Sequence, residues 1–312
     1  MSATNLSVLF SNLVGLFLLI GVGFLAVRLK VIPAQTSKPL SSLLMKITLP
    51  ATVFASLIRP FDPEFMKLGV IAIGLSLLFF SLFVPLNLAI SRLLRVPDGQ
   101  RGMWCCCATF SNTGFMGFPV AYALFGDEGL ILAVLINIPF NFLLYSVGVW
   151  MVCKDVQGAK GSFSLGKVLI SPLNIGMCLG LIFYFTQISV PEAIFTPIEH
   201  LSNVTTPLSM LVTGMNLAQG KTSDVIRDKN AITCSLTRLL VCPVIAWAVM
   251  ALIPNLNSLV MGVTLLIMAM PSPAATPIIG EQYNGNVQLG ARVVFLSSLL
   301  CIVTLPLVSL LL

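Results

Sequence analysis

The chain has 312 residues and a formal net charge of +6, but only 9% of its residues are charged and 57% are hydrophobic. Since a soluble domain carries about 25% charged residues, this composition excludes a soluble protein and predicts one embedded in a membrane. The eight cysteines show no C-x-x-C or Cys/His ligand spacing, so the sequence favours neither a zinc site nor a disulfide framework.

Ten apolar segments follow one another along the chain, each long enough to cross a bilayer, which takes roughly 20 residues. The first has no basic stretch before it and no small-residue cleavage site after it, so we interpret it as a retained helix rather than a signal peptide. The ten predicted helices comprise residues 7–27, 40–58, 66–90, 102–125, 129–152, 168–187, 198–218, 231–252, 258–283 and 289–311.

Basic residues gather in alternate connections between these helices. One set of connections holds twelve, namely Arg28, Lys30, Lys38, Arg92, Arg95, Arg101, Lys154, Lys160, Lys167, Lys221, Arg227 and Lys229. The other set holds only Arg59 and Lys67. By the positive-inside rule the first set is cytoplasmic, which places both termini outside. We expect a multi-pass protein of the cell (plasma) membrane.

Prolines recur at an interval of about 158 residues, which indicates an internal duplication. The pairs are Pro33/Pro191, Pro39/Pro197, Pro85/Pro243, Pro119/Pro277, Pro50/Pro207 and Pro97/Pro254. Each half, residues 1–155 and residues 156–312, holds five predicted helices. Because five is odd, the second half enters the membrane from the opposite side. The predicted fold is therefore an all-α membrane protein with ten transmembrane helices in two inverted five-helix repeats, an architecture typical of secondary transporters.

The fourth and ninth predicted helices carry residues that break a helix. The fourth contains Gly114, Gly117 and Pro119, and the ninth contains three prolines within residues 271–277. Proline removes a backbone donor and clashes with the preceding turn, and the freed backbone groups cannot face lipid. We therefore predict that both helices unwind at mid-depth and line a cavity. We also expect Pro277→Ala to re-form part of the ninth helix and to cripple transport.

Two half-helices restarting after such breaks suit an anion, because a helix N-terminus presents unpaired N–H groups and about half a positive charge. The half-helices that end there offer free carbonyls, which suit Na⁺ or another cation. The prediction is a small organic anion bound without a dedicated basic residue inside the membrane. Its predicted binding residues are Ser111, Asn112, Thr113, Gly114, Gly117, Pro119, Asn137, Asn141, Pro271, Ser272, Pro273, Thr276 and Pro277.

Asn137 and Asn141 lie one turn apart in the fifth predicted helix, so their side chains share a face. Amides facing lipid would be costly, and we expect this face to point into the helix bundle. Two roles are open for it, contact with the substrate and hydrogen bonding between helices.

Ionisable residues inside the predicted spans are few. No Asp or Glu lies mid-span, which argues against proton coupling through a membrane carboxylate and leaves uniport or coupling to a cation held by carbonyls and amides. No cofactor or metal is expected, and neither Na⁺ nor H⁺ is assigned as a coupling ion. Lys46, Arg238 and Arg292 can snorkel to the cytoplasmic face. We hypothesise that Lys46 or Arg238 attracts anions to an inward-open vestibule.

Several motifs resemble one known family over nearly the whole chain. They are Leu-Pro-Ala-Thr-Val-Phe at residues 49–54, Ser-Asn-Thr-Gly-Phe-Met-Gly-Phe-Pro-Val at residues 111–120, Gly-Met-Asn-Leu-Ala at residues 214–218, and the segments at residues 291–300 and 304–306. The family is that of the auxin efflux carriers, which includes PIN-type exporters and bacterial malate or malonate permeases.

The resemblance implies two inverted repeats whose fourth and ninth helices cross at the binding site. It also implies a scaffold of helices 1, 2, 6 and 7, often a homodimer interface, beside a mobile bundle of helices 3–5 and 8–10. Carboxylate substrates contact an asparagine of the fourth helix in this family, and Asn112 is the matching position. The long cytoplasmic loop of the long PIN-type members is missing from this sequence.

We predict a secondary active or facilitative carrier for a small carboxylate that works by elevator-like alternating access. A cation/proton antiporter of the same architecture and a membrane sensor that does not transport are the alternatives. An enzyme is not expected, because no helix pairs residues at catalytic spacing. The expected partners are the carboxylate, the lipid bilayer and a second copy of the chain bound through the scaffold helices, with no nucleic acid. Malate, malonate, lactate and aromatic acids all remain open as substrates.

Overall fold

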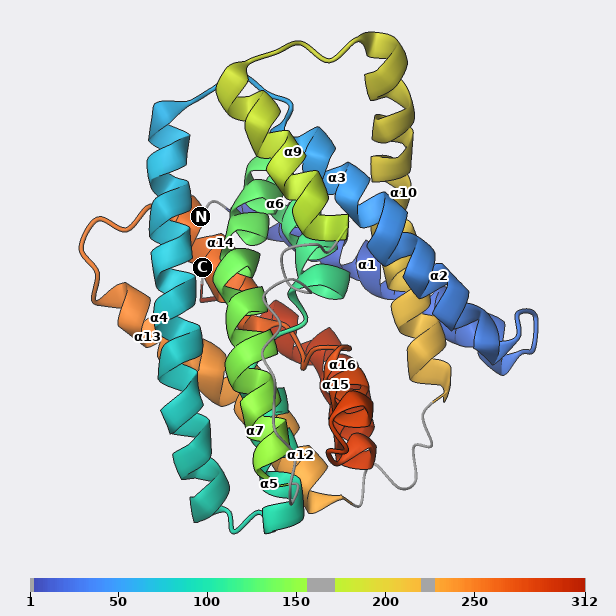
Figure 1. The fold of residues 1–312 in the computed structure, drawn as a ribbon, viewed down its shortest axis with the longest axis vertical. Coiled ribbons are helices and arrows are strands. Elements are labelled where there is room, and N and C mark those ends of the chain that lie inside the picture. The colour runs from blue at the N-terminus through green and yellow to red at the C-terminus, as the bar shows by residue number, and fades with distance from the viewer. Residues whose placement is uncertain (1–2, 156–171, 220–227, 312) are drawn as a thin grey trace. The chain divides into compact units, whose positions relative to one another are not determined.

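The computed structural model describes residues 3–155, 172–219 and 228–311, and these residues form helices joined by short connections, with no strand among them (Figure 1). The predicted loop residues Lys160, Lys167, Lys221 and Arg227 lie outside this description, as do residues 168–171 of the sixth predicted helix. By length and composition, five described stretches are apolar enough to cross a membrane, namely Ala34–Leu57, Pro63–Leu93, Asp98–Lys154, Lys229–Ala251 and Val287–Ser309.

The chain divides into two compact units. Unit 1 comprises Met1–Val70, Gly114–Leu135 and Leu165–Gln219. Its elements are α1 (Ala3–Arg28), η1 (Ala34–Thr36), α2 (Ser37–Leu43), η2 (Leu44–Thr48), α3 (Leu49–Leu57), α9 (Pro172–Thr186) and α10 (Glu192–Gln219), together with η3 (Thr113–Gly117) from Gly114 onward and the first part of α6 (Phe118–Leu143).

Unit 2 comprises Ile71–Thr113, Ile136–Ser164 and Gly220–Leu312. It contains α4 (Pro63–Leu93) from Ile71 onward and the end of α6. Its other elements are α5 (Asp98–Thr109), η4 (Leu144–Gly148), α7 (Val149–Lys154), α12 (Lys229–Leu236), η5 (Thr237–Val241), α13 (Cys242–Ala251), α14 (Ser258–Ala269), α15 (Thr276–Gln282) and α16 (Val287–Ser309).

All ten predicted segments are helical over their described residues, with interruptions in the fourth and the ninth. Residues 126–128, the predicted connection between the fourth and fifth helices, lie inside α6. Gly126 there has φ 65° and ψ −156°, so the chain leaves the helical conformation at this residue. Such a positive φ is easily adopted only by glycine, which explains why the turn falls at this position.

Three prolines share one local setting. Pro50, Pro119 and Pro243 are each the second residue of a helix that directly follows a five-residue π turn, namely η2, η3 and η5. A proline in a helix removes a hydrogen bond to the carbonyl four residues earlier, and its ring clashes with that carbonyl. A π turn closes its hydrogen bonds over five residues, and we interpret the three turns as the local adjustment that admits these prolines.

Small residues allow the helices of unit 1 to pack closely. A Cβ added at Gly23 of α1 would overlap the backbone of Leu211, and one at Gly214 of α10 would overlap the backbone of Ile20. The backbones of α1 and α10 therefore touch at two points. In a membrane the hydrophobic effect does not drive helices together, because lipid tails are as apolar as the side chains. Helices therefore associate through the close packing that such small residues allow.

Replacing Gly23 with Val is expected to destabilise the protein by about 3 kcal/mol, because the new side chain overpacks the α1–α10 contact. Gly21→Val is the matched control on the same helix, since nothing lies within 4 Å of a Cβ built at Gly21. Thermal unfolding of the two purified variants measures the difference. Equal melting temperatures would contradict the assigned packing.

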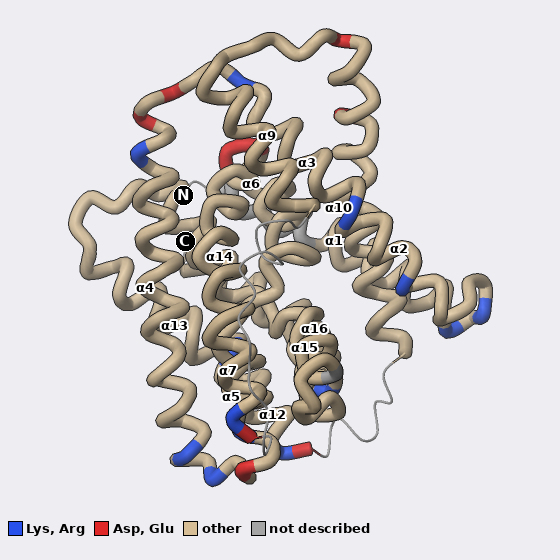
Figure 2. Tube along the Cα trace, in the orientation of Figure 1, with Lys and Arg blue, Asp and Glu red and all other residues tan. Residues whose placement is uncertain are grey.

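Charged residues of unit 2 gather where α4 ends and where α5 and α12 begin (Figure 2). Arg101 pairs with Asp98 at 2.6 Å. Asp228 accepts hydrogen bonds from the first amides of α12 and pairs with Arg292 of α16 at 2.9 Å. Arg292, as predicted for a residue that snorkels, thus reaches the charged end of this unit rather than its interior.

Candidate functional site

The fourth and ninth predicted helices are both interrupted, as the sequence predicts. The first interruption separates α5 from η3, with Phe110 in an extended conformation (φ −96°, ψ 151°). The second separates α14 from α15, with Met270 likewise extended (φ −64°, ψ 151°). Because α5 and α14 end here, their last carbonyls have no partner within their own helices.

The prolines that interrupt the ninth helix are Pro271 and Pro273, which lie between α14 and α15. Pro277 lies in the first turn of α15, where proline is tolerated because the amide it lacks would have no helical partner. The expectation that Pro277→Ala re-forms the helix is therefore replaced by one that concerns Pro271 and Pro273.

The two interruptions are hydrogen-bonded to each other within unit 2. The backbone N–H of Asn112 donates to the carbonyl of Pro271 at 2.7 Å. The hydroxyl of Ser272 donates to the carbonyl of Cys107 at 2.8 Å, and the Cys107 thiol lies 3.5 Å from the hydroxyl of Thr276. The structure thus brings four predicted site residues of the two helices together, and it adds Cys107, which no sequence pattern singled out. We call this junction, residues 107–113 and 268–276, the crossover.

Two neighbouring helices of unit 2 hold the crossover in place. The hydroxyl of Thr113 donates to the side-chain oxygen of Asn137 at 2.6 Å, and Asn137 is buried. The backbone N–H of Ser272 donates to the hydroxyl of Ser297 on α16 at 3.1 Å. Asn137 therefore joins a helix to the crossover, whereas Asn141 is only partly buried and no hydrogen bond links it to the crossover. Asn137 thus makes a hydrogen bond between helices, one of the two roles left open for these asparagines, and contact with the substrate stays a prediction for both.

Two polar side chains at the crossover lack a partner among the described residues. The Oγ of Ser111 is fully buried and makes no hydrogen bond. Asn112 is 6% exposed, and the hydrogen bond that joins it to the described residues, to Pro271, is made by its backbone and not by its side-chain amide. Because a buried polar group without a partner costs about 1–3 kcal/mol, these two groups are suited to a polar ligand.

The remaining predicted residues are placed separately. Gly114 and Gly117 lie in η3 and Pro119 in the first turn of α6, in the part of the chain that belongs to unit 1. A Cβ at Gly114 would have nothing within 4 Å. Lys46 lies in η2 of unit 1 and is exposed, as expected of a side chain that snorkels.

The position of the Arg238 side chain differs from the one that the sequence suggested. Its side chain is 0% exposed, so it does not snorkel, and its guanidinium lies at the crossover. Nη1 donates to the carbonyl of Thr109 at 3.0 Å and to that of Ala108 at 3.4 Å. Nε donates to Met270 at 3.1 Å, and Nη2 donates to Met268. A basic residue thus lies at the junction, where it contacts backbone carbonyls, and an anion bound without a dedicated basic residue stays a prediction.

These bonds also correct the expectation of free carbonyls at the breaks. Each helix C-terminus carries about half a negative charge, so the ends of α5 and α14 together offset about one positive charge. Among the described residues no carboxylate lies within 4.0 Å of Arg238. The guanidinium is thus neutralised by two helix ends rather than by an acid. The sequence signal for this was a basic residue deep in an apolar helix, which by default indicates a functional site.

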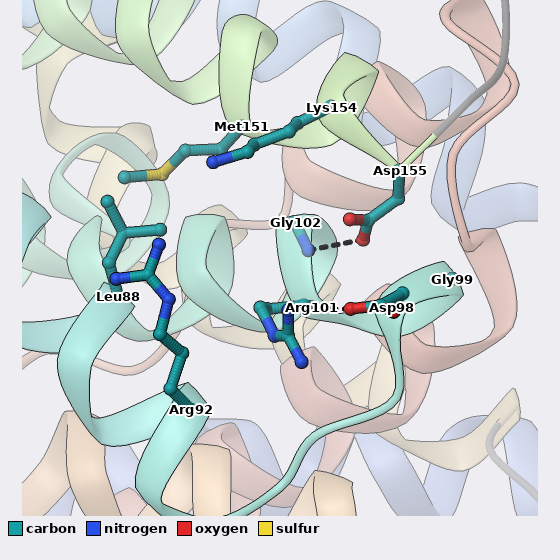
Figure 3. A pocket seen from close by; sticks show the side chains of 9 residues that line it. All are labelled: Leu88, Arg92, Asp98, Gly99, Arg101, Gly102, Met151, Lys154 and Asp155. Atoms are coloured by element: carbon teal, nitrogen blue, oxygen red, sulfur yellow. Dashed lines mark hydrogen bonds and ion pairs between the residues drawn. The ribbon is translucent and has the colours of Figure 1, made fainter.

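A cavity of about 220 Å³ lies at the charged end of unit 2 (Figure 3). Arg92, Lys154 and the Arg101–Asp98 pair line it, and the carboxylate of Asp155 accepts a hydrogen bond from the Gly102 amide. Burial raises the pKa of Asp155, and the hydrogen bond from Gly102 opposes that shift. Since none of the predicted binding residues lines this cavity, the candidate site stays at the crossover.

No group of three or more His, Cys, Asp or Glu side chains that could hold a metal occurs in the described part of the chain. Cysteines 105–107 are buried in α5 with free thiols, as expected for small apolar residues inside a helix.

Comparison with known proteins adds a family. A family model described as membrane transport protein matches residues 8–162 and residues 159–309. An uncharacterized transporter of Methanocaldococcus jannaschii is 26% identical over 287 residues, which cover 90% of this chain and 91% of that protein. An uncharacterized transporter of Methanothermobacter thermautotrophicus is 25% identical and covers 96% of each chain. A "putative malonate transporter" of Rhizobium meliloti is 21% identical over 92% of this chain and 91% of its own length.

Proposed function

The chain belongs to the membrane transport protein family, the auxin efflux carrier family that its motifs resemble, and on this premise we propose that it carries a small organic anion with a carboxylate group. It is an integral multi-pass membrane protein. The observation that supports a carboxylate is the unpaired hydroxyl of Ser111 at the crossover, next to the largely buried side chain of Asn112, whose amide makes no hydrogen bond to a described residue. Both can donate a hydrogen bond to a carboxylate oxygen.

The local charge also favours an anion. The N–H groups that follow each break lie near the start of a helical segment, where the helix dipole is positive. The negative ends of α5 and α14 are offset by Arg238. Without that guanidinium, two carbonyl ends would repel a carboxylate held at the same junction. When the guanidinium is present, Ser111 and Asn112 can donate hydrogen bonds to an anion with little repulsion from the two carbonyl ends.

We further propose that the anion moves together with unit 2. The unpaired donors, Asn137, Arg238 and the broken segment 270–275 all belong to that unit. A site contained in one compact unit supports an elevator-like mechanism, in which a bundle carries its substrate past a scaffold. Under this proposal α1, α3, α9 and α10 of unit 1 form the scaffold and the surface through which a homodimer forms.

The fold proposal retains ten membrane helices in two inverted repeats. The two matches of the family model, to residues 8–162 and residues 159–309, support the duplication that the proline spacing predicts. The gathering of charges at one end of unit 2 (Figure 2) supports a cytoplasmic position for that end. Both termini are then outside.

The decisive experiment is counterflow in proteoliposomes with a panel of labelled acids. Malonate comes first because one relative is named for it, followed by malate, lactate and an aromatic acid. We expect at least one carboxylate, and no amine or neutral analogue of the same size, to exchange. A protein that exchanges none of the acids, or exchanges the neutral amide equally well, would not be a carboxylate carrier.

A further inference from the structure

We propose that Arg238 is the resident cation of the crossover, so that carboxylate transport requires no Na⁺ at this junction. This inference rests on the proposed function for its transport consequence, although its binding chemistry can be tested without a substrate. It concerns the carbonyl ends of α5 and α14, which the sequence suggests as ligands for a mobile cation.

The geometry of the guanidinium matches the position of such a cation. Carbonyls at the ends of interrupted helices are the groups that coordinate Na⁺ in broken-helix transporters. Here those of Thr109, Met268 and Met270 accept hydrogen bonds from one side chain. Arg238 therefore bridges the two half-helices as a metal ion would, and it is covalently attached.

Three further carbonyls near the ends of the half-helices are also occupied. The Cys107 carbonyl accepts from Ser272, that of Cys106 accepts from the Phe110 amide, and that of Ile267 accepts from the Met270 amide. An added cation that bound to any of these carbonyls would have to displace a bond already made. The planar guanidinium suits the arrangement because its donors diverge in one plane and it is less strongly hydrated than an ammonium.

The position of Arg238 on its helix supports a dedicated role. It lies in the π turn η5, and π turns inside α-helices are frequent at functional sites. Phe83 of α4 flanks the guanidinium carbon, 6.0 Å from the ring centroid. The buried guanidinium contacts backbone carbonyls and an aromatic ring, and no described carboxylate pairs with it. This arrangement offsets the partial negative charges of the two helix ends.

The test uses Arg238→Ala in purified full-length protein and measures its melting temperature. We expect a fall of about 10 °C, because the removed charge leaves several buried carbonyls unpaired. Guanidinium at about 10 mM, at which its denaturing effect is negligible, should restore most of that fall with saturation. The wild type and the exposed-site control Arg92→Ala should not respond. Guanidinium that acts equally on all three proteins would overturn the proposal.

A second pair of variants covers the case in which Arg238→Ala does not fold. Arg238→Lys keeps a positive charge at the junction, whereas Arg238→Gln keeps only neutral donors. The glutamine variant should be stabilised by guanidinium or Na⁺, and the lysine variant should not. An identical response of the two variants would refute the resident-cation role.

The transport arm replaces Na⁺ by choline in proteoliposomes. Wild-type carboxylate counterflow should change by less than about twofold, well below the tenfold that corresponds to 1.4 kcal/mol. A loss of flux without Na⁺ would contradict Na⁺ independence. If no carboxylate exchanges in any salt, the proposed function fails instead, and the melting experiments still decide the role of Arg238.

Discussion

Asn112→Ala is expected to lower carboxylate affinity by about 10- to 100-fold while the protein still folds, because a hydrogen bond to a charged group contributes about 1.5–3 kcal/mol. The expectation is sharp because Asn112 has two separable roles. Its backbone N–H joins the two breaks through Pro271, and alanine keeps that N–H. Its side-chain amide has no protein partner, so the substitution removes only the group assigned to the substrate.

Binding is measured on purified protein with the acid that counterflow identifies, for example by isothermal titration. Asn216→Ala is the matched control, since Asn216 is an exposed asparagine of unit 1 outside the crossover. The melting temperature of Asn216→Ala should equal that of the wild type, and that of Asn112→Ala should not be lower. Unchanged affinity in Asn112→Ala would remove this residue from the binding site and, with it, the main support for a carboxylate.

The second large effect concerns the break in the ninth helix. Replacing both Pro271 and Pro273 with Ala is expected to let α14 continue toward α15, because alanine restores the two missing donors and removes the ring clashes. The carbonyl of Pro271 would then turn into the helix and away from the Asn112 amide. Loss of that hydrogen bond costs about 1.5 kcal/mol in the stability of the junction, so the two breaks separate and both carboxylate affinity and transport rate should fall.

Counterflow measures the transport rate, and amide hydrogen exchange over residues 270–275 reports whether the helix has formed. Pro277→Ala is the control for helix formation, because Pro277 already lies in the first turn of α15 and its replacement should leave exchange over residues 270–275 unchanged. Slow exchange over residues 270–275 together with full flux would show that transport does not need the interruption.

The sequence was sufficient to place the helices and both breaks. Hydrophobic length determined the ten segments, and clusters of glycine and proline determined the interruptions, because these residues act on the local backbone. Asn112 and Ser272 were predicted at the junction for the same reason, as polar residues beside a break. Such local features can be interpreted without knowing which helices are neighbours.

The sequence could not show in which direction a long basic side chain points. A lysine or arginine two turns from a helix end can reach toward water or into the protein, and Lys46 and Arg238 looked equivalent on that basis. In the structure Lys46 is exposed and Arg238 is 0% exposed. Residue spacing fixes the face of a regular helix, but η5 is a π turn, and its presence is not evident from residue spacing. The carbonyls that Arg238 contacts come from two distant segments, which no local pattern reveals.

The π turn η5 has a further consequence. It holds one residue more than an α-helical turn would, and one residue corresponds to a rotation of about 100° around the helix axis. Deleting one residue between Arg238 and Cys242 should therefore restore a regular α-helix and rotate the preceding residues around the helix axis relative to α13. Position 238 would then present its charge away from the junction, although the composition of the helix would hardly change. The extra residue of the π turn therefore decides the direction in which the Arg238 side chain points.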